Sequence, residues 1–523
     1  MDIQDKSDHG SITAGENLPF WIDSAPLLSF APLQNDIETD VLVIGGGIAG
    51  LTTAYLLANS GKKVTLIEDG LIGSGETGRT TAHLTCALDD RYYFLENTFG
   101  EEATRLAAES HQAAIAMIET ISKNENIDCG FKHVDGYLFS HPSDEEQNLD
   151  KEWEASRKAG IDTSLENTTP GIEAGAHLRS LKFPRQAQFH VMKYIGGLAE
   201  AIVRYGGDIY TDTRAETVNK KGAKANGYTI KANSIVVATN SPINDIFTMH
   251  TKQHAYRSYV IGCKVKRGTL PYALWWDTGD NDSKWVSKPY HYVRLEPFDD
   301  EYDLLISGGE DHKTGQSDEE TLNETDRYEM LENWTRLNFA GLEETAYRWS
   351  GQVMEPVDSL GYMGRNPGDE NIYIITGDSG NGMTHTTIGA MIIHDSILGG
   401  KNQWEDLYNP SRITLKTIPD FLKEAGNMAS QYLDWIRPSD LKSMQELQRG
   451  DGGILTSGLK KIAVYRDIDN KLHTFSAVCP HLGCIVQWNG DEKSFDCPCH
   501  GSRFGCDGTV LNGPAKSDLM KLD

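Results

Sequence analysis

Two short segments near the C-terminus combine cysteine and histidine at spacings that suit a metal or redox site. They read CPHLGC and CPCHGS, and they supply two ligand pairs, Cys479 with His481 and Cys497 with His500. Thiolate and imidazole groups bind both iron–sulfur clusters and tetrahedral zinc, so the donor types alone leave both open. A chain of 523 residues needs no disulfide scaffold, so the clustered cysteines favour metal or redox chemistry.

The two segments resemble those of the Rieske family. The resemblance implies a [2Fe–2S] cluster in which Cys479 and Cys497 bind one iron while His481 and His500 bind the other. Two neutral imidazoles in place of two thiolates remove negative charge, and this raises the reduction potential of such clusters. Two separate segments are needed because each one supplies one cysteine and one histidine.

Two further cysteines argue against the zinc alternative. Cys484 and Cys499 occupy positions that form a disulfide in Rieske proteins of the cytochrome bc type, and the resemblance implies the same bridge here. Ser502 matches the serine whose hydroxyl group hydrogen-bonds a cluster sulfide in such proteins. Phe504 stands where the family often has tyrosine, and because phenylalanine donates no hydrogen bond, we expect a somewhat lower potential.

Oxygenation at a second, mononuclear iron is disfavoured. Rieske oxygenases hold that iron with two histidines and a carboxylate. The tail from Ala515 to Asp523 contains no histidine, and the preceding NGPA segment resembles the proline loop that covers the cluster.

A glycine turn near the N-terminus predicts a dinucleotide site. Gly45, Gly47 and Gly50 follow the apolar strand VLVI and precede a helix. The first allows the tight turn, the second lets the backbone approach a diphosphate, and the third lets helix and strand pack closely. Glu68 ends the next strand and is placed to accept hydrogen bonds from the ribose hydroxyls. On this motif alone NAD and FAD both remain open.

Two further motifs resemble the D-amino-acid-oxidase-like superfamily of FAD-dependent amine oxidoreductases, over about residues 37–400. They are GSGETGRTTAHLT, which follows the second strand, and IYIITGDSGNGMTHTTIGAMII, which comes much later. The resemblance implies FAD with a second glycine turn around the flavin ring, and a further segment near the ring or the diphosphate. Some members attach the flavin covalently through histidine or cysteine; His83 and Cys86 lie in that region but do not clearly match, so we expect non-covalent FAD. The residues concerned are Gly377, Asp378, Gly380, Gly382, Met383 and Thr384 in the turn, and Arg79, Thr80 and Thr81 in the segment.

The superfamily binds substrate over the flavin and under an antiparallel sheet, and segment 254–262 is expected to belong to that sheet. Arg257, Tyr256 and Tyr259 are candidates for holding a substrate carboxylate or amine, although such residues on a strand more often serve sheet packing or a solvated edge. Three histidines could act as acid–base groups, and two tryptophans could form an aromatic wall for a cationic amine. These are His83, His291 and His385, and Trp275 and Trp276.

These groups must be positioned by strands and helices. The order of strand, glycine turn and helix segments predicts an α/β FAD-binding domain of the Rossmann-like, glutathione-reductase type. An antiparallel-sheet substrate domain is inserted into it, and a small all-β Rieske domain follows. We expect an N-terminal arm at 1–36, the discontinuous oxidoreductase at 37–400, a linker at 401–440 with one short helix, and the Rieske domain at 441–523.

Charge and hydropathy limit the kinds of molecule that the protein is expected to bind. The chain carries 76 acidic and 49 basic residues, a net charge of −27, so nucleic acid is an unfavourable partner. No apolar run reaches the length that spans a membrane, and the first residues show no hydrophobic signal segment, so we expect a cytoplasmic protein.

The sequence favours a dehydrogenase that oxidises an amine or amino-acid-type substrate by hydride transfer to FAD. One electron at a time would then pass through the Rieske cluster to an external acceptor. One alternative reverses the flow, so that an external donor protein and the Rieske domain feed electrons to the flavin for oxygen-dependent chemistry. A second alternative is a non-catalytic redox sensor.

Overall fold

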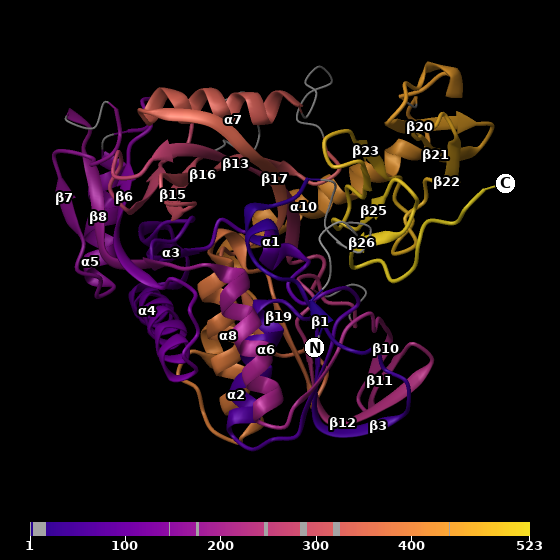
Figure 1. Ribbon diagram of the computed structural model, residues 1–523, viewed down its shortest axis with the longest axis horizontal. Helices are drawn as coiled ribbons and strands as arrows, with labels where there is room; N and C mark the ends of the chain where they lie inside the picture. The colour runs from indigo at the N-terminus through magenta and orange to yellow at the C-terminus, as the bar shows by residue number, and fades with distance from the viewer. Residues whose placement is uncertain are drawn as a thin grey trace.

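The computed structural model describes residues 2–3, 17–145, 147–173, 177–244, 249–282, 290–316, 325–438 and 440–522. Most of the predicted N-terminal arm, residues 4–16, therefore lies outside the described residues. Figure 1 shows three parts: a lower half built around α2, α6 and α8, an upper sheet beneath α7, and a C-terminal β domain at the right.

An eight-stranded sheet forms the lower half, and its parallel centre has the order β19-β12-β3-β4-β9. Strand β3 is a continuous buried run from Val41 to Ile44, as a strand covered on both faces requires. The strands are β3 (Ile37–Ile44), β4 (Val64–Ile67), β9 (Asp208–Tyr210), β10 (Ala215–Asn219), β11 (Gly222–Ala225), β12 (Tyr228–Val237), β18 (Tyr362–Arg365) and β19 (Ile372–Thr376).

Helix α2 (Ile48–Asn59) is apolar on almost every face because it lies between the sheet and two other helices, α6 (Val191–Arg204) and α8 (Gly382–Ile397). It begins after Gly47, directly beyond the turn from β3. Gly45 has a φ of +114°, and a β-carbon there would lie 2.3 Å from the carbonyl oxygen of Ala238. Only glycine therefore fits this turn.

A nine-stranded sheet, mostly antiparallel, forms the upper part, and α7 (Thr325–Asn338) covers it over β13 and β16 (Figure 1). Its strands are β5 (His83–Leu84), β6 (Lys132–Phe139), β7 (Ser164–Glu166), β8 (Ser180–Gln188), β13 (Gln253–Lys266), β14 (Ala273–Asp277), β15 (Tyr292–Pro297), β16 (Tyr302–Lys313) and β17 (Leu342–Pro356). The other helices of these two parts are α1 (Phe20–Ser24), α3 (Tyr92–Phe99), α4 (Glu101–Asn124) and α5 (Gln147–Lys158).

The segment between the second glycine turn and the C-terminal domain is more ordered than the sequence suggested. It contains α9 (Glu405–Tyr408), the 14-residue helix α10 (Ile418–Gln431) and two 3-10 turns, where one short helix was predicted. Pro419 falls in the first turn of α10, where its missing N–H has no partner to lose, so this proline does not break the helix.

The C-terminal domain consists of two small antiparallel sheets. The strands are β20 (Asp451–Ser457), β21 (Lys460–Arg466) and β22 (Leu472–Ser476) in one sheet, and β23 (Gln487–Asn489), β24 (Ser494–Asp496), β25 (Arg503–Gly505) and β26 (Val510–Asn512) in the other. Both cysteine–histidine segments are loops, one after β22 and one between β24 and β25. Within the part of the chain that the structure describes, no helix combines the length and apolarity needed to cross a bilayer.

Candidate active site and cluster site

A cavity of about 280 Å³ lies where the two large sheets and the C-terminal domain meet. The glycine turn after β3, the turn before α8, and the strands β13 and β17 all contribute to its wall. From the C-terminal domain, Val510 to Gly513, Ala515 and Lys516 also line it. The cavity therefore contains both sequence motifs predicted to hold FAD.

One end of the cavity is built for a dinucleotide. Gly45, Gly47 and Glu68 line it, while Gly50 lies behind the turn, where a β-carbon would stand 1.9 Å from the carbonyl oxygen of Gly45. The carboxylate of Glu68 accepts the N–H of Gly46 at 2.5 Å and that of Gly70 at 3.0 Å. Burial and the neighbouring Asp69 raise the pKa of Glu68 to about 8, whereas the two backbone N–H groups favour its charged form. Glu68 lines the cavity, where its carboxyl group can hydrogen-bond ribose hydroxyls.

Two further groups of predicted flavin-binding residues line the same cavity. They are Arg79, Thr80 and Thr81, and Asp378, Gly380, Gly382 and Met383. Gly377 and Thr384 lie outside the lining: Gly377 makes the turn with a φ of +67°, and the Thr384 hydroxyl hydrogen-bonds His111 at 2.8 Å. This arrangement, together with the glycine turn after β3, fits an FAD molecule spanning the cavity.

His385 supports the turn from behind. It is 1 % exposed, lies outside the cavity lining, and its Nδ1 lies 2.8 Å from the carbonyl oxygen of Asp378. Because a carbonyl can only accept, Nδ1 carries the proton. Burial lowers the pKa of His385 to about 4, so it is a neutral donor that positions the turn.

His83 does line the cavity, but both of its nitrogens are engaged. Nε2 lies 3.2 Å from the carbonyl oxygen of Val293, and Nδ1 lies 3.0 Å from the Thr81 hydroxyl. Nε2 therefore carries the proton and Nδ1 accepts. Burial and the nearby Arg294 lower the pKa of His83 to about 3, so it is neutral at physiological pH.

The structure places Arg257 and Tyr259 on the face of β13 away from the cavity. Side chains alternate along a strand, and it is Ser258 and Val260 that line the cavity wall. The Tyr259 hydroxyl hydrogen-bonds His312 at 3.0 Å. Tyr256 lines a second, open cavity next to the first.

Of the remaining aromatic and histidine candidates, one lines the cavity and the others lie outside it. Trp276 lines the cavity, whereas Trp275 packs on Phe339 on the opposite side of β14. His291 lies between Asp277, at 2.8 Å, and Glu310, at 3.2 Å, outside both cavities. Burial opposes its charge, but the two carboxylates raise the pKa of His291 to about 9, so it forms a buried ion cluster.

The four predicted cluster ligands converge in the C-terminal domain. The side chains of Cys479 and Cys497 belong to the same buried core of this domain, and the ring centroids of His481 and His500 lie 4.9 Å apart. A cysteine pair and a histidine pair side by side match the two irons of a Rieske cluster.

A disulfide joins the two loops through Cys484 and Cys499, whose α-carbons are 6.4 Å apart. The sulfurs of this pair and of Cys497 lie within 4.8 Å of one another. Disulfide sulfurs are not thiolates, however, so these three residues do not form a ligand set of their own.

The cluster loops pack directly against the wall of the FAD cavity. The Gln352 amide on β17, which lines the cavity, donates to the carbonyl oxygen of Gly501 at 3.0 Å, and the Gln316 amide donates to that of Pro498 at 2.9 Å. A β-carbon on Gly501 would lie 2.3 Å from that of Ala255. One residue of β17 therefore separates the cavity from a cluster loop.

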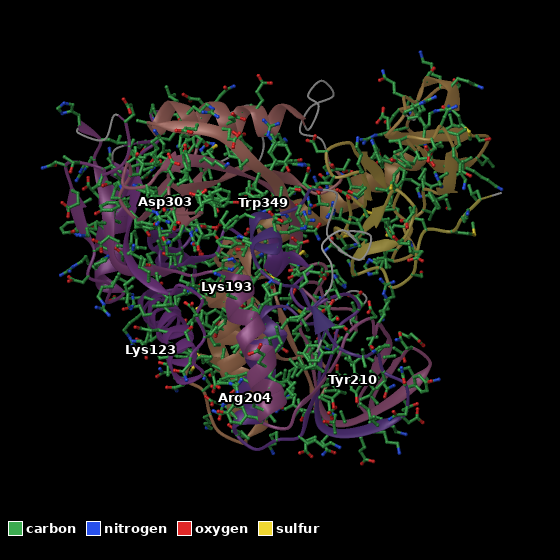
Figure 2. The ribbon with its side chains drawn as sticks, in the orientation of Figure 1. Lys123, Lys193, Arg204, Tyr210, Asp303 and Trp349 are labelled. Carbon is green, nitrogen blue, oxygen red and sulfur yellow. A yellow bond between two sulfur atoms is a disulfide. The ribbon has the colours of Figure 1, made fainter. Side chains whose placement is uncertain are left out.

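A buried carboxylate anchors the two parts. Glu492, in the turn after β23, is 1 % exposed and lies 3.7 Å from Arg79 and 4.0 Å from Arg257. Burial opposes its charge, but the two arginines hold the pKa of Glu492 below its ordinary value. Trp349, labelled on β17 in Figure 2, donates its indole N–H to the carbonyl oxygen of Arg79 at 2.8 Å.

Sequence reasoning missed the residues that join the two parts. Glu492 lies between the two cysteine–histidine segments, and a charged turn there reads as solvated surface. Gln352 is one of several polar residues in β17, and no sequence signal sets it apart from the others. Both are recognisable only when the domains are seen packed together.

Comparison with known proteins agrees with this architecture. A family model of FAD-dependent oxidoreductases (DAO) matches residues 40–395, and the model of the Rieske [2Fe-2S] domain matches residues 438–523. The chain is 33% identical over 512 residues to YhfW of Bacillus subtilis (strain 168), described as a Rieske 2Fe-2S iron-sulfur protein, covering 96% of this chain and 97% of that protein.

Two further relatives match the oxidoreductase part. Gamma-glutamylputrescine oxidoreductase of Escherichia coli (strain K12) is 23% identical over 400 residues, covering 73% of this chain and 88% of that protein. The structure of glycine oxidase from Geobacillus kaustophilus superimposes with a TM-score of 0.59 at 16% identity, covering 72% of this chain and 99% of that one.

The chain therefore belongs to the FAD-dependent oxidoreductase (DAO) family and carries a C-terminal Rieske domain. It is an oxidoreductase whose cofactors are FAD and a [2Fe–2S] cluster. The predicted fold class and both predicted cofactors are confirmed, and the zinc alternative falls away.

Proposed function

We propose that this enzyme oxidises an amine or amino-acid-type substrate and passes the electrons through its Rieske cluster to an external acceptor. The shared wall of the two cofactor sites supports this most strongly. Gln352 lines the FAD cavity and hydrogen-bonds a cluster loop, and residues 510–513 of the Rieske domain line the same cavity.

When bound, FAD would supply a two-electron hydride acceptor, and the [2Fe–2S] cluster would supply a one-electron carrier. The chain supplies position and exclusion of water. Glu68 and the glycine turn hold the dinucleotide end, and the neutral His385 holds the turn before α8. Both nitrogens of His83 are occupied, so we assign no histidine as a base, and the substrate amine reacts as the neutral species.

An amine is favoured by similarity as well as by the site. The E. coli relative acts on gamma-glutamylputrescine. Arg257, the predicted carboxylate-binding residue, faces away from the cavity towards Glu492.

Anaerobic addition of candidate amines to the purified holoenzyme tests this proposal. We expect the flavin absorbance to bleach and the electron paramagnetic resonance signal of a reduced Rieske cluster to appear at a kinetically linked rate. Flavin that bleaches while the cluster stays oxidised would refute the relay. Cluster reduction only by an added external reductase would support the reversed flow instead.

A Cys497→Ser variant provides the matched control. Without the cluster, substrate should still bleach the flavin, while reduction of a one-electron acceptor such as ferricytochrome c should be lost. Far-ultraviolet circular dichroism and FAD content would establish that the variant is folded.

A further inference from the structure

A second cavity of about 650 Å³, open to solvent, adjoins the flavin end of the first. Asp89, Tyr290, Asp311 and Glu355 line both cavities, so they form a common wall. The Tyr290 hydroxyl donates to Asp89 at 2.5 Å, and the Ser379 hydroxyl in the turn before α8 donates to Glu355 at 2.8 Å. A molecule that reaches the flavin from this side passes the carboxylates of that wall.

Carboxylates dominate the lining of this open cavity. They come from segments far apart in the chain, namely Asp89, Asp90, Asp144, Glu152, Asp311, Glu355 and Glu424. Among the described lining residues, the groups that could carry positive charge are Arg91 and His254. Arg91 donates to the carbonyl oxygens of Leu88 and Asp277, and burial lowers the pKa of His254 to about 4. Glu424 is paired with Lys313, which partly offsets its charge.

Glu152 gives an independent indication of a ligand. Its side chain is 1 % exposed and lines the cavity, and its Oε1 has no hydrogen-bond partner in the structure. The other oxygen accepts the N–H of Tyr93 at 3.3 Å. A buried carboxylate oxygen with no donor is costly, and a bound cation with N–H groups would satisfy it.

The raised pKa values of the carboxyl groups in the cavity wall agree with a binding site for a cation. Burial raises the pKa of Asp90, Asp311 and Glu152 to about 7 each, and burial together with Asp90 and Asp89 raises the pKa of Glu355 well above its ordinary value. A cation within a few ångströms of these groups would lower all four pKa values.

We propose that this acidic cavity binds the distal cationic group of a substrate that carries two amines, so that the substrate class is a diamine or polyamine. The proximal amine then lies at the flavin, beyond Asp311 and Glu355. This inference rests on the proposed function and narrows its substrate. A substrate with a carboxylate at the distal position would be repelled by the same wall.

Binding can be separated from oxidation by using the holoenzyme after anaerobic reduction with dithionite, because reduced flavin accepts no hydride. Isothermal titration calorimetry with 1,4-diaminobutane, 1-aminobutane and 4-aminobutanoate compares a dication, a monocation and a zwitterion of equal chain length. We expect the diamine to bind at least tenfold more tightly than the other two, and its advantage to shrink as salt is raised from 50 to 500 mM.

Two neutral variants test the named residues. Glu152→Gln and Asp90→Asn should each weaken diamine binding three- to tenfold and leave binding of 1-aminobutane within twofold. Glu344→Gln, an exposed residue paired with Lys264 far from the cavity, should change neither. Two variants at separate positions keep the test informative if one of them folds poorly.

Equal affinity for diamine and monoamine, equal losses of both in the variants, or no binding of the diamine would each overturn the inference. Failure of the proposed function has a different signature. In that case the diamine would still bind preferentially to the reduced enzyme, but no amine would bleach the oxidised flavin.

Discussion

Ser502 illustrates how one hydroxyl group can set the properties of the cluster. It is fully buried, and its oxygen accepts the N–H of Ala515 at 3.0 Å, so its own proton can be donated to a sulfur of the cluster. A donor to a ligand sulfur stabilises the more negative, reduced state of a cluster. The nearby Phe504 is buried as well and has no such donor to offer.

We therefore expect Ser502→Ala to lower the reduction potential of the cluster. A net hydrogen bond of about 1 kcal/mol corresponds to roughly 40 mV for a one-electron couple. Redox titration followed by electron paramagnetic resonance measures the shift. Ser457→Ala, at an exposed position of β20, is the control, and an unchanged potential in both variants would contradict the assignment.

Gly50 tests the packing of the first glycine turn. A β-carbon there would lie 1.9 Å from the carbonyl oxygen of Gly45, a backbone atom that cannot move aside. Gly50→Ala should cost about 1–3 kcal/mol of stability by overpacking and lower the FAD content. The ratio of flavin to protein absorbance measures the latter.

Gly196→Ala is the matched control, because it also adds a single methyl group to a helical glycine. Its β-carbon would have Leu28 as nearest neighbour at 3.7 Å, an ordinary contact. We expect full FAD content and a gain of about 0.5–1 kcal/mol from helix propensity. Equal behaviour of the two variants would show that the turn tolerates a side chain.

At the scale of elements, the turn after β23 is held against η2 (Glu76–Arg79) and β13 by the buried carboxylate of Glu492. Glu492→Gln would leave two buried guanidinium groups with less compensating charge. Removing one partner of a buried ion pair costs about 3–5 kcal/mol. We expect a lower melting temperature and faster proteolysis in the segment between the domains.

The exposed pair of Glu344 and Lys264 provides the comparison for this prediction. Glu344 is 68% exposed, so Glu344→Gln should change stability by less than about 1 kcal/mol. If Glu492→Gln melts as the wild type does, the ion cluster does not hold the domains together.

At the scale of the whole molecule, buried carboxyl groups make stability depend on pH. Burial raises the pKa of Glu152 to about 7, above the ordinary value of 4.5 that the unfolded chain would show. The folded state therefore binds a proton that the unfolded state has lost. The resulting stabilisation is complete below about pH 4.5 and disappears as the pH rises through 7.

Glu152→Gln keeps a neutral side chain at every pH and should remove this dependence. The free energy of unfolding of the wild type, relative to the variant, should fall by an amount on the order of 3 kcal/mol between pH 5 and pH 8. Chemical denaturation at both pH values measures it. Parallel curves for the two proteins would show that Glu152 titrates normally.

Local motifs were sufficient to predict both cofactors. The glycine turn and the paired cysteine–histidine loops work through neighbours within a few positions, so their spacing carries the chemistry. Glu68, the two glycine turns and the four residues proposed as cluster ligands could all be named before the fold was known. The prediction of a linker with one short helix was wrong because its prolines were read as breakers, although Pro419 lies in the first turn of α10.

Which residues face the substrate was determined only by the tertiary structure. Arg257 and Tyr259 look suitable in the sequence, but alternation along β13 points them away from the cavity and presents Ser258. The acidic cavity draws its carboxylates from strands, helices and loops far apart in the chain, and Glu492 meets Arg79 only when the Rieske domain packs on the sheet. Chemistry held within one turn or loop can be read from spacing, whereas a surface assembled from distant segments exists only once the chain has folded.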